Sequence, residues 1–213
     1  MWLHPPPFSL TWPDMDTSER NQLRSSIRHL RRQLTPSQQH QHSHYLAQQL
    51  CKHPLFLRSR RIACYLAEDG EIDPQLIIEK AWRTGKQVFL PVLPPMGTSL
   101  FFAPYRPDSE LTANRFNILE PVVAHQEWIR ARQLSLILLP LVAFDSRGNR
   151  LGMGGGYYDR SLQFTRHRKQ WHSPHLIGLA HELQKVNQLP PQTWDVPLNL
   201  IATEHTIYTP GKK

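Results

Sequence analysis

A cluster of glycines in the second half of the chain carries the first chemical signal. Four of the five residues in Gly152-Met-Gly-Gly-Gly156 are glycine, Arg150 lies just before them and Asp159 just after them. Glycines cost conformational entropy, and one reason to gather them is a loop whose amide groups, with the start of a following helix, must approach phosphate oxygens. Arginine contacts phosphate in a bidentate manner, and a carboxylate offers Mg²⁺ a hard oxygen. The pattern predicts a site for a phosphorylated ligand and a metal ion.

The glycines alone leave two interpretations open, because a flexible loop or tight turn accounts for them equally well. The segment is not a Walker A motif, since no Gly-Lys-Ser/Thr follows it. It is not a dinucleotide fingerprint either, because Tyr157 occupies the place of the last glycine. General motifs therefore indicate a phosphate ligand without specifying which one.

The elements that must position this loop alternate between strands and helices. Apolar segments predict strands over residues 61–66, 86–92, 100–105, 134–140, 175–180 and 199–203, with helices over 73–84 and 122–132. The strand before the glycines is almost continuously apolar, as expected of a central strand buried on both faces. This alternation predicts an α/β fold: a three-layer α/β/α sandwich with a mostly parallel, Rossmann-like open sheet that binds ligands at the carboxyl ends of its strands.

The N-terminal part of the chain differs from the rest in composition. Residues 1–18 are rich in proline and predict an irregular extension, whereas residues 19–213 predict a single α/β catalytic domain. An apolar stripe at helical spacing predicts an amphipathic helix with arginines on its remaining surface: Leu23, Ile27, Leu30 and Leu34. Thr35-Pro36-Ser-Gln38 resembles a capping box and predicts a second helix as far as Leu50.

The overall composition limits the class of protein. The 25 Lys and Arg residues against 17 Asp and Glu residues give a net charge of +8, which favours anionic partners. No apolar run approaches the length of a membrane span, and the first residues lack the basic region of a secretory signal. Two cysteines without CxxC spacing, Cys51 and Cys64, indicate no disulfide framework. We expect a cytoplasmic protein, a monomer, that binds small molecules and neither membranes nor nucleic acid.

A longer string around the glycines resembles the signature of a known family. Pro140-Leu-Val-Ala-Phe-Asp145 is followed by Gly148-Asn-Arg-Leu-Gly-Met-Gly-Gly-Gly-Tyr-Tyr-Asp-Arg160, and this is similar to the 5-formyltetrahydrofolate cyclo-ligases, also called methenyltetrahydrofolate synthetases. The resemblance runs from about Arg20 to Ile201. It implies an enzyme in which ATP phosphorylates the formyl oxygen of 5-formyltetrahydrofolate and N10 attacks the activated carbon. The products would be 5,10-methenyltetrahydrofolate, ADP and phosphate.

The resemblance also implies roles for individual residues. The ATP site would contain two arginines of the first helix and the glycine loop: Arg20, Arg24, Arg150, Leu151, Gly152, Met153, Gly154, Gly155, Gly156, Tyr157 and Tyr158. Of these, Arg150, Tyr157 and Tyr158 would act in catalysis. The folate would contact Leu66 and Glu71, and Mg²⁺ would be held by Asp159 and Asp195.

Two positions depart from the family pattern. The family usually has lysine where this chain has Arg20, which keeps the positive charge but not the point-charge geometry. Pro74 stands where the family often has threonine, so a hydroxyl contact is absent there. Without the resemblance, Glu71 would be interpreted as a solvated charge before a helix, and Asp195 would remain open to interpretation as a turn residue.

Other polar residues are expected to be structural or solvent-exposed. Arg28, Arg31 and Arg32 are interpreted as a solvated helix face. The three histidines of the second helix, His40, His42 and His44, are expected to be exposed, and no HExxH motif accompanies them. Cys64 is expected to be an inert core residue.

Two other functions compete with the cyclo-ligase hypothesis. The arginine-bearing first helix could bind nucleic acid, although it lacks interleaved aromatic residues for base stacking. A different ATP-dependent ligase on the same fold is the third possibility. A weaker hypothesis is that the positive field attracts folates with several glutamates.

Overall fold

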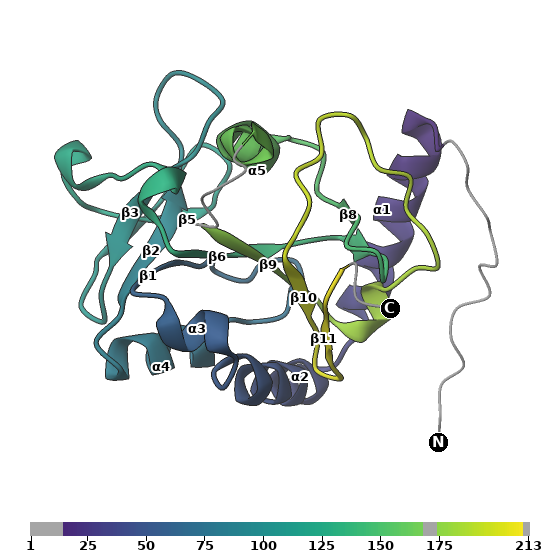
Figure 1. Ribbon diagram of the computed structural model, residues 1–213, viewed down its shortest axis with the longest axis horizontal. Helices are drawn as coiled ribbons and strands as arrows, with labels where there is room; N and C mark the ends of the chain where they lie inside the picture. The colour runs from purple at the N-terminus through teal and green to yellow at the C-terminus, as the bar shows by residue number, and fades with distance from the viewer. Residues whose placement is uncertain (1–14, 168–173, 211–213) are drawn as a thin grey trace.

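A seven-stranded sheet forms the centre of the computed structural model, which describes residues 15–167 and 174–210. Its strand order is β11-β10-β9-β6-β1-β2-β3, as Figure 1 shows. The strands are β1 (Arg61–Ala63), β2 (Gln87–Val92), β3 (Phe101–Tyr105), β6 (Leu136–Pro140), β9 (His175–Leu179), β10 (Leu200–Ala202) and β11 (Ile207–Tyr208). The five inner strands are parallel, and the edge strands β3 and β11 are antiparallel to their neighbours. The predicted mostly parallel sheet is confirmed.

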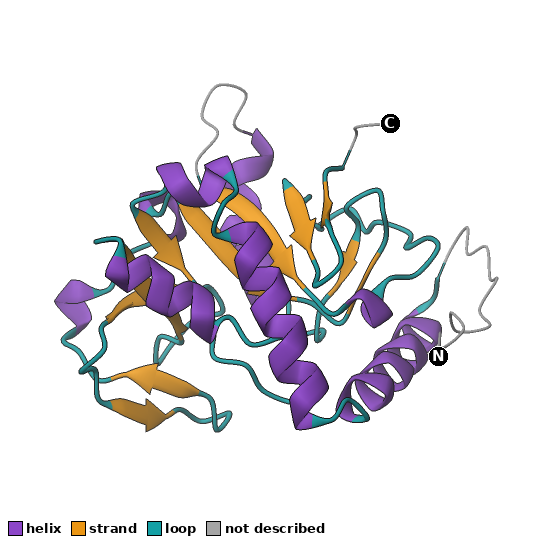
Figure 2. Cartoon of the chain, turned by 90° about the horizontal axis from the view of Figure 1, so that it is seen from below, coloured by secondary structure: helices purple, strands orange, loops and turns teal. Residues whose placement is uncertain are grey.

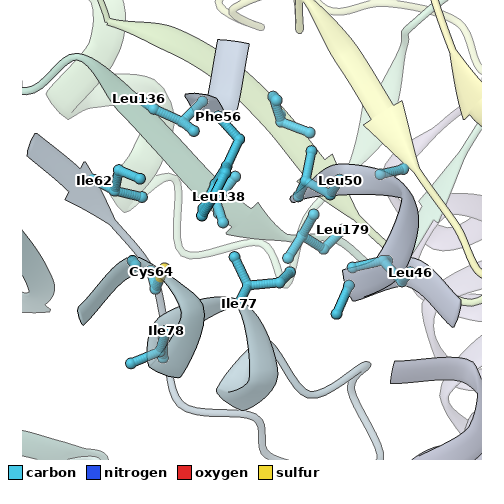
Figure 3. Close-up of a cluster of buried hydrophobic side chains, with 14 of the residues drawn as sticks. Leu46, Leu50, Phe56, Ile62, Cys64, Ile77, Ile78, Leu136, Leu138 and Leu179 are labelled. Atoms are coloured by element: carbon cyan, nitrogen blue, oxygen red, sulfur yellow. The ribbon is translucent and has the colours of Figure 1, made fainter. Parts of the chain in front are cut away.

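Helices cover both faces of this sheet, which gives the predicted three layers (Figure 1). One layer contains α2 (Pro36–Leu50), α3 (Pro54–Arg58) and α4 (Gln75–Arg83), and the opposite layer contains α5 (Tyr157–Leu162) with short 3₁₀ turns. Side chains of β6 alternate between the two: Leu136 and Leu138 join the cluster under α2 and α4 that Figure 3 shows, while Ile137 and Leu139 join the opposite cluster. The central strand is therefore buried on both faces, as its apolar sequence predicts.

The first two helices begin where their sequences predict. Asp16 and Glu19 form a capping box at α1 (Thr17–Arg32), and Thr35 and Gln38 form one at α2. Figure 2 shows α1 near the N-terminus, joined to α2 by a short connection. Ile27 of α1 packs in a small cluster with a hairpin of β7 (Ala143–Phe144) and β8 (Arg150–Leu151). As a result, α1 lies against the segment that carries the glycine loop.

The helix predicted over residues 122–132 is wrong. This segment forms two 3₁₀ turns, η1 (His125–Glu127) and η2 (Ala131–Gln133), and between them Ile129 exchanges two backbone hydrogen bonds of 2.9 Å with Phe102. Pairing with the edge strand β3 requires extended backbone at Ile129, and this tertiary contact overrides the local pattern. The short strands β4 (Leu111–Ala113), β5 (Leu119–Pro121), β7, β8 and β11 were not predicted.

Two further expectations concern the N-terminus and the membrane. Most of the extension predicted over residues 1–18 lies outside the described residues, and α1 already begins at Thr17. Met15 is buried beside Ile27. Within the described residues, no helix is both long enough and apolar enough to cross a bilayer.

The chain order creates a switch point between β1 and β6. From β1 the chain moves to β2 on one side, and it later returns to β6 on the other side of β1. In open α/β sheets, ligands bind outside the carboxyl ends of the strands at such a point. The two segments that leave these strand ends contain Glu71 and the glycine loop, so the fold brings both predicted ligand-binding segments to one edge.

Candidate active site

The β7–β8 hairpin holds the glycine loop above the end of β6. Asp145 at its turn is fully buried and accepts hydrogen bonds from the backbone N–H groups of Arg147 and Asn149, both 3.0 Å, and of Leu189, 2.9 Å. A buried carboxylate with several N–H donors fixes the backbone around it. The sequence contains a signal for this role, because Asp145 is a charged residue that directly ends an apolar run.

The glycine loop itself remains largely exposed, from Gly152 to Gly155. Gly154 and Gly156 have φ angles of +101° and +65°, which residues with a side chain adopt only under strain. A Cβ added at Gly156 would lie 2.6 Å from the Arg160 guanidinium. Glycine is therefore required at these two positions by the backbone, and the loop keeps its amide groups accessible.

Two arginines of α1 approach this loop from the side. Arg24 donates through Nε to the carbonyl oxygen of Gly152 at 2.8 Å, and its guanidinium lies beside Gly154. Arg20 donates to the carbonyl oxygen of Pro190 at 3.2 Å. Burial, followed by the charge of Arg20, lowers the pKa of Arg24. The structure thus brings Arg24 to the loop and Arg20 to the neighbouring Pro190 segment, and the two positive charges repel each other.

A buried ion pair lies beneath the loop. Arg150 donates one hydrogen bond to Asp159 Oδ1 and another to the carbonyl oxygen of Val196, and the Val196 N–H donates to Asp159 Oδ1 at 3.3 Å. The Arg150 side chain is only 6% exposed. Breaking such a pair would leave an uncompensated charge, so Arg150 and Asp159 fix each other's position.

Asp195 lies close enough to Asp159 for the two charges to interact. Burial, followed in part by the negative charge of Asp159, raises the pKa of Asp195. Asp195 also accepts a 2.8 Å hydrogen bond from the backbone N–H of Gln192, so it acts as a turn residue as well. The hydrogen bond supports the interpretation of Asp195 as a turn residue, and its role as a metal ligand stays a prediction. Two neighbouring carboxylates, one partly buried, are a donor set suited to a hard divalent cation.

The two tyrosines after the loop face different surroundings. Tyr158 lies where the charges of Glu71 and Arg150 both reach its hydroxyl; burial, followed by Glu71, raises its pKa. Tyr157 instead packs edge-on against Phe116, with ring centroids 6.1 Å apart, and under the Arg160 guanidinium. Tyr158 is therefore the member of the pair that lies between the two ligand-binding segments.

Glu71 is a partly buried carboxyl group and not a solvated charge. Burial raises its pKa to about 7, although Arg31 opposes this shift from 3.8 Å. Glu71 lines a hollow of about 490 Å³ between α2 and residues 67–76. Leu66, just after β1, is half-buried and packs on the core cluster under α2 and α4.

The expectation that Arg31 is solvated is wrong. Arg31 is completely buried and donates to Asp69 through Nε, to the carbonyl oxygen at 2.9 Å, and through Nη2, to the carboxylate at 3.0 Å. Arg28 and Arg32 bind the same carboxylate from more exposed positions. The missed signal is spacing, because Arg31 follows Ile27 of the apolar stripe by four residues.

The expected exposure of the α2 histidines is correct for His40 and His44 but wrong for His42. His42 is partly buried and contacts His181, a residue 139 positions away. Cys64 is buried as expected, and burial raises the pKa of its thiol. Exposure of a helix side chain cannot be judged from the helix alone when a distant loop covers it.

Comparisons with known proteins agree with this architecture. Residues 16–204 match the model of the 5-formyltetrahydrofolate cyclo-ligase family. Enzymes of that name from Escherichia coli K12 and Haemophilus influenzae are each 42% identical, over 85% and 86% of this chain and 98% and 97% of their own. The solution structure of the Aquifex aeolicus 5,10-methenyltetrahydrofolate synthetase is 28% identical, with a TM-score of 0.76, over 91% of this chain and 94% of its own. The chain belongs to the 5-formyltetrahydrofolate cyclo-ligase family.

Proposed function

We propose that this protein converts 5-formyltetrahydrofolate to 5,10-methenyltetrahydrofolate and uses ATP to do so. The observation that carries the proposal is the meeting of two segments at the β1–β6 switch point. One is the exposed glycine loop with the arginines around it, and the other contains Glu71. Tyr158 lies between them, within reach of charges from both sides. Family membership supports the same assignment.

The glycine loop and its arginines suit the phosphate side of the reaction. In the proposed step, the formyl oxygen attacks the γ-phosphorus of ATP and ADP leaves; the formyl carbon is then attacked by N10, and the carbon–oxygen bond breaks as phosphate departs. Loop amides together with Arg24 and Arg150 would neutralise charge on the transferring group, and positioned charge is the main contribution a protein makes to phosphoryl transfer. Oxygen attached to phosphorus is a far better leaving group than an amide-like oxygen.

Asp159 and Asp195 would hold the magnesium ion. The fit rests on the chemistry of the donors, because two carboxylates close enough for their charges to interact offer the hard oxygens that Mg²⁺ prefers. When bound, Mg²⁺ would neutralise phosphate charge. Since Asp159 is already paired with Arg150, the guanidinium and the metal would share this carboxylate.

Glu71 suits the folate side of the same site. With a pKa of about 7, its carboxyl group exists in both protonation states near neutral pH. N10 loses a proton when it forms the new bond, and a carboxylate poised near the working pH is an effective acceptor. Glu71 would therefore hold the folate and accept this proton.

The contacts of the α1 arginines favour this function over nucleic-acid binding. All five donate to groups of the protein itself: Arg20, Arg24, Arg28, Arg31 and Arg32. A phosphate-backbone surface needs cations that are not already neutralised, whereas Asp69 pairs with Arg28, Arg31 and Arg32. The alternative that remains is another ATP-dependent ligase reaction at the same site.

A direct assay tests the proposal. Purified protein with ATP, Mg²⁺ and 5-formyltetrahydrofolate is expected to generate the near-ultraviolet absorbance of the methenyl product. Arg150→Ala and Asp159→Asn should each lower kcat by about 100- to 1000-fold, because each removes preorganised charge. The surface variants Arg132→Ala and Asp108→Asn should stay within about twofold of the parent. Absence of product from the parent protein, with ATP hydrolysed in the presence of another acceptor, would assign the site to a different ligase.

A further inference from the structure

Three side chains that could ligate a metal meet on the far side of the carboxyl edge from the glycine loop. His42 comes from α2, His181 follows β9, and Glu204 follows β10. One ligand atom from each lies within 4.8 Å of the other two, and within the described part of the chain no other such trio occurs. His181 and Glu204 are buried, whereas the His42 side chain is 21% exposed. The cluster is thus nearly enclosed, with one exposed member.

The hydrogen bonds of His181 fix where its proton lies. His181 Nε2 is 3.2 Å from the carbonyl oxygen of Gly70, which can only accept, so Nε2 carries the hydrogen. Its Nδ1 therefore presents a lone pair to the cluster. Burial, followed by the proximity of His42, lowers the pKa of His181 to about 3. His181 is consequently neutral at physiological pH, which is the form that binds metals.

The remaining contacts follow from this assignment. His42 Nδ1 lies 2.9 Å from His181 Nδ1 and 3.4 Å from Glu204 Oε1. Because His181 offers a lone pair there, the hydrogen between the two rings belongs to His42. The other Glu204 oxygen accepts from the backbone N–H of Glu182 at 2.9 Å. The hydrogen on His42 Nδ1 thus lies between the two imidazole rings, and the carboxylate oxygen of Glu204 is close to it.

We propose that His42, His181 and Glu204 form a binding site for a divalent transition metal of the Zn²⁺ class. Two imidazoles and one carboxylate suit this class, whereas Mg²⁺ and Ca²⁺ prefer all-oxygen sets. Tetrahedral Zn²⁺ separates two ligand atoms by about 3.3 Å. The two rings, now 2.9 Å apart at their Nδ1 atoms, would part by about 0.4 Å, and the ligand atoms of His181 and Glu204, which lie within 4.8 Å, would move closer together. The Gly70 carbonyl already orients His181 through its second nitrogen, as outer-shell acceptors do at metal sites.

Metal binding here would reach the folate side of the active site. His181 holds the Gly70 carbonyl oxygen, and Gly70 lies between Asp69 and Glu71. A metal ion bound by His42, His181 and Glu204 would fix the imidazole of His181 more rigidly and, through it, this turn. The site is structural, and it is separate from Asp159 and Asp195.

Calorimetric titration of the untagged full-length protein with ZnCl₂, in excess Mg²⁺, tests the site. We expect one Zn²⁺ per chain. Co²⁺ should give an intense visible absorption, as expected of a four-coordinate site. A Zn²⁺ concentration 100-fold above Kd should raise Tm by about 5 to 10 °C.

Variants of α2 provide the matched controls. His42→Ala should weaken Zn²⁺ binding by about 100-fold or more and remove the Tm shift. The double variant His40→Ala/His44→Ala, which removes two exposed histidines of the same helix, should bind like the parent. Equal binding by the parent and His42→Ala would overturn the proposal, as would loss of binding in the double variant. Glu204→Gln, which preserves the size of the side chain, should bind Zn²⁺ more weakly than the parent and more tightly than His42→Ala.

Discussion

The two segments that leave the adjacent strands β1 and β6 are built in opposite ways. After β1, the turn from Asp69 to Glu71 is largely buried, and three arginines of α1 surround its carboxylates. After β6, the loop from Gly152 to Gly155 is exposed and offers mainly backbone amides. In the first segment, arginines of the protein pair with the carboxylates. In the second segment, the exposed amide groups remain available to an anionic ligand. Substitutions in the first should therefore affect stability most, and substitutions in the second should affect binding most.

Removal of Arg31 should have the largest effect on stability. Arg31→Ala leaves Asp69 and Glu71 without their buried partner, and loss of one member of a buried ion pair costs about 3 to 5 kcal/mol. Arg32→Ala is the matched control, because it removes a cation from the same carboxylate at a position whose side chain is 56% exposed. That change should cost less than about 1 kcal/mol. Urea denaturation measures both values, and similar costs for the two would contradict the contrast in burial.

The second prediction concerns the pH dependence contributed by Glu71. Its pKa is about 7 in the folded protein and 4.5 in the absence of the fold, so between these values the folded state binds more protons. The free energy of unfolding should therefore fall by about 2 kcal/mol as pH rises from 5 to 7. Glu71→Gln should abolish this fall and make the protein more stable than the parent at pH 8.

Urea midpoints between pH 5 and pH 8 test this prediction. Glu127→Gln, at an exposed side chain, is the control and should preserve the fall. If the free energy of unfolding of the parent rises over this interval, and that of Glu71→Gln rises equally, Glu71 does not have the raised pKa that its burial predicts.

The third and smallest effect should come from the glycine loop. Gly154→Ala forces a side chain onto a φ of +101°, at a cost of about 1 to 2 kcal/mol, and should weaken ATP binding about 5- to 30-fold. Gly97→Ala imposes the same strain at φ +100°, with open space around the new Cβ. The control should lose similar stability and keep its affinity for ATP. Equal ATP affinity in both variants would show that the loop conformation is unimportant for the nucleotide.

Sequence patterns predicted the elements whose stability is local. The strand before the glycines is continuously apolar, and α1 and α2 carry complete capping boxes, so both helices begin close to the predicted residues. The prediction of a helix over residues 122–132 was wrong because Ile129 pairs with Phe102 from a different part of the chain. Local preference does not include such a contact.

The candidate site likewise contains features that could be predicted from the sequence and features that could not. The glycine loop could be identified from a contiguous motif, whereas Glu71 was identified only through the family resemblance. The burial of Arg31 and His42 could not be predicted, because their partners lie 38 and 139 residues away. The different surroundings of Tyr157 and Tyr158 were also beyond the sequence, since they depend on Phe116 and on a segment that follows β1.

The position of α1 against the loops has a consequence for how the protein is made. Its contacts join residues far apart in the chain: Arg24 meets Gly152 across 128 positions, and Arg20 meets Pro190 across 170. Contacts of such high sequence separation form late, because a long loop must close before they stabilise anything. During synthesis, α1 must therefore wait until Gly152 and Pro190 have been made before it can dock against them. The proposed nucleotide side of the site is complete only after Pro190 has been synthesised.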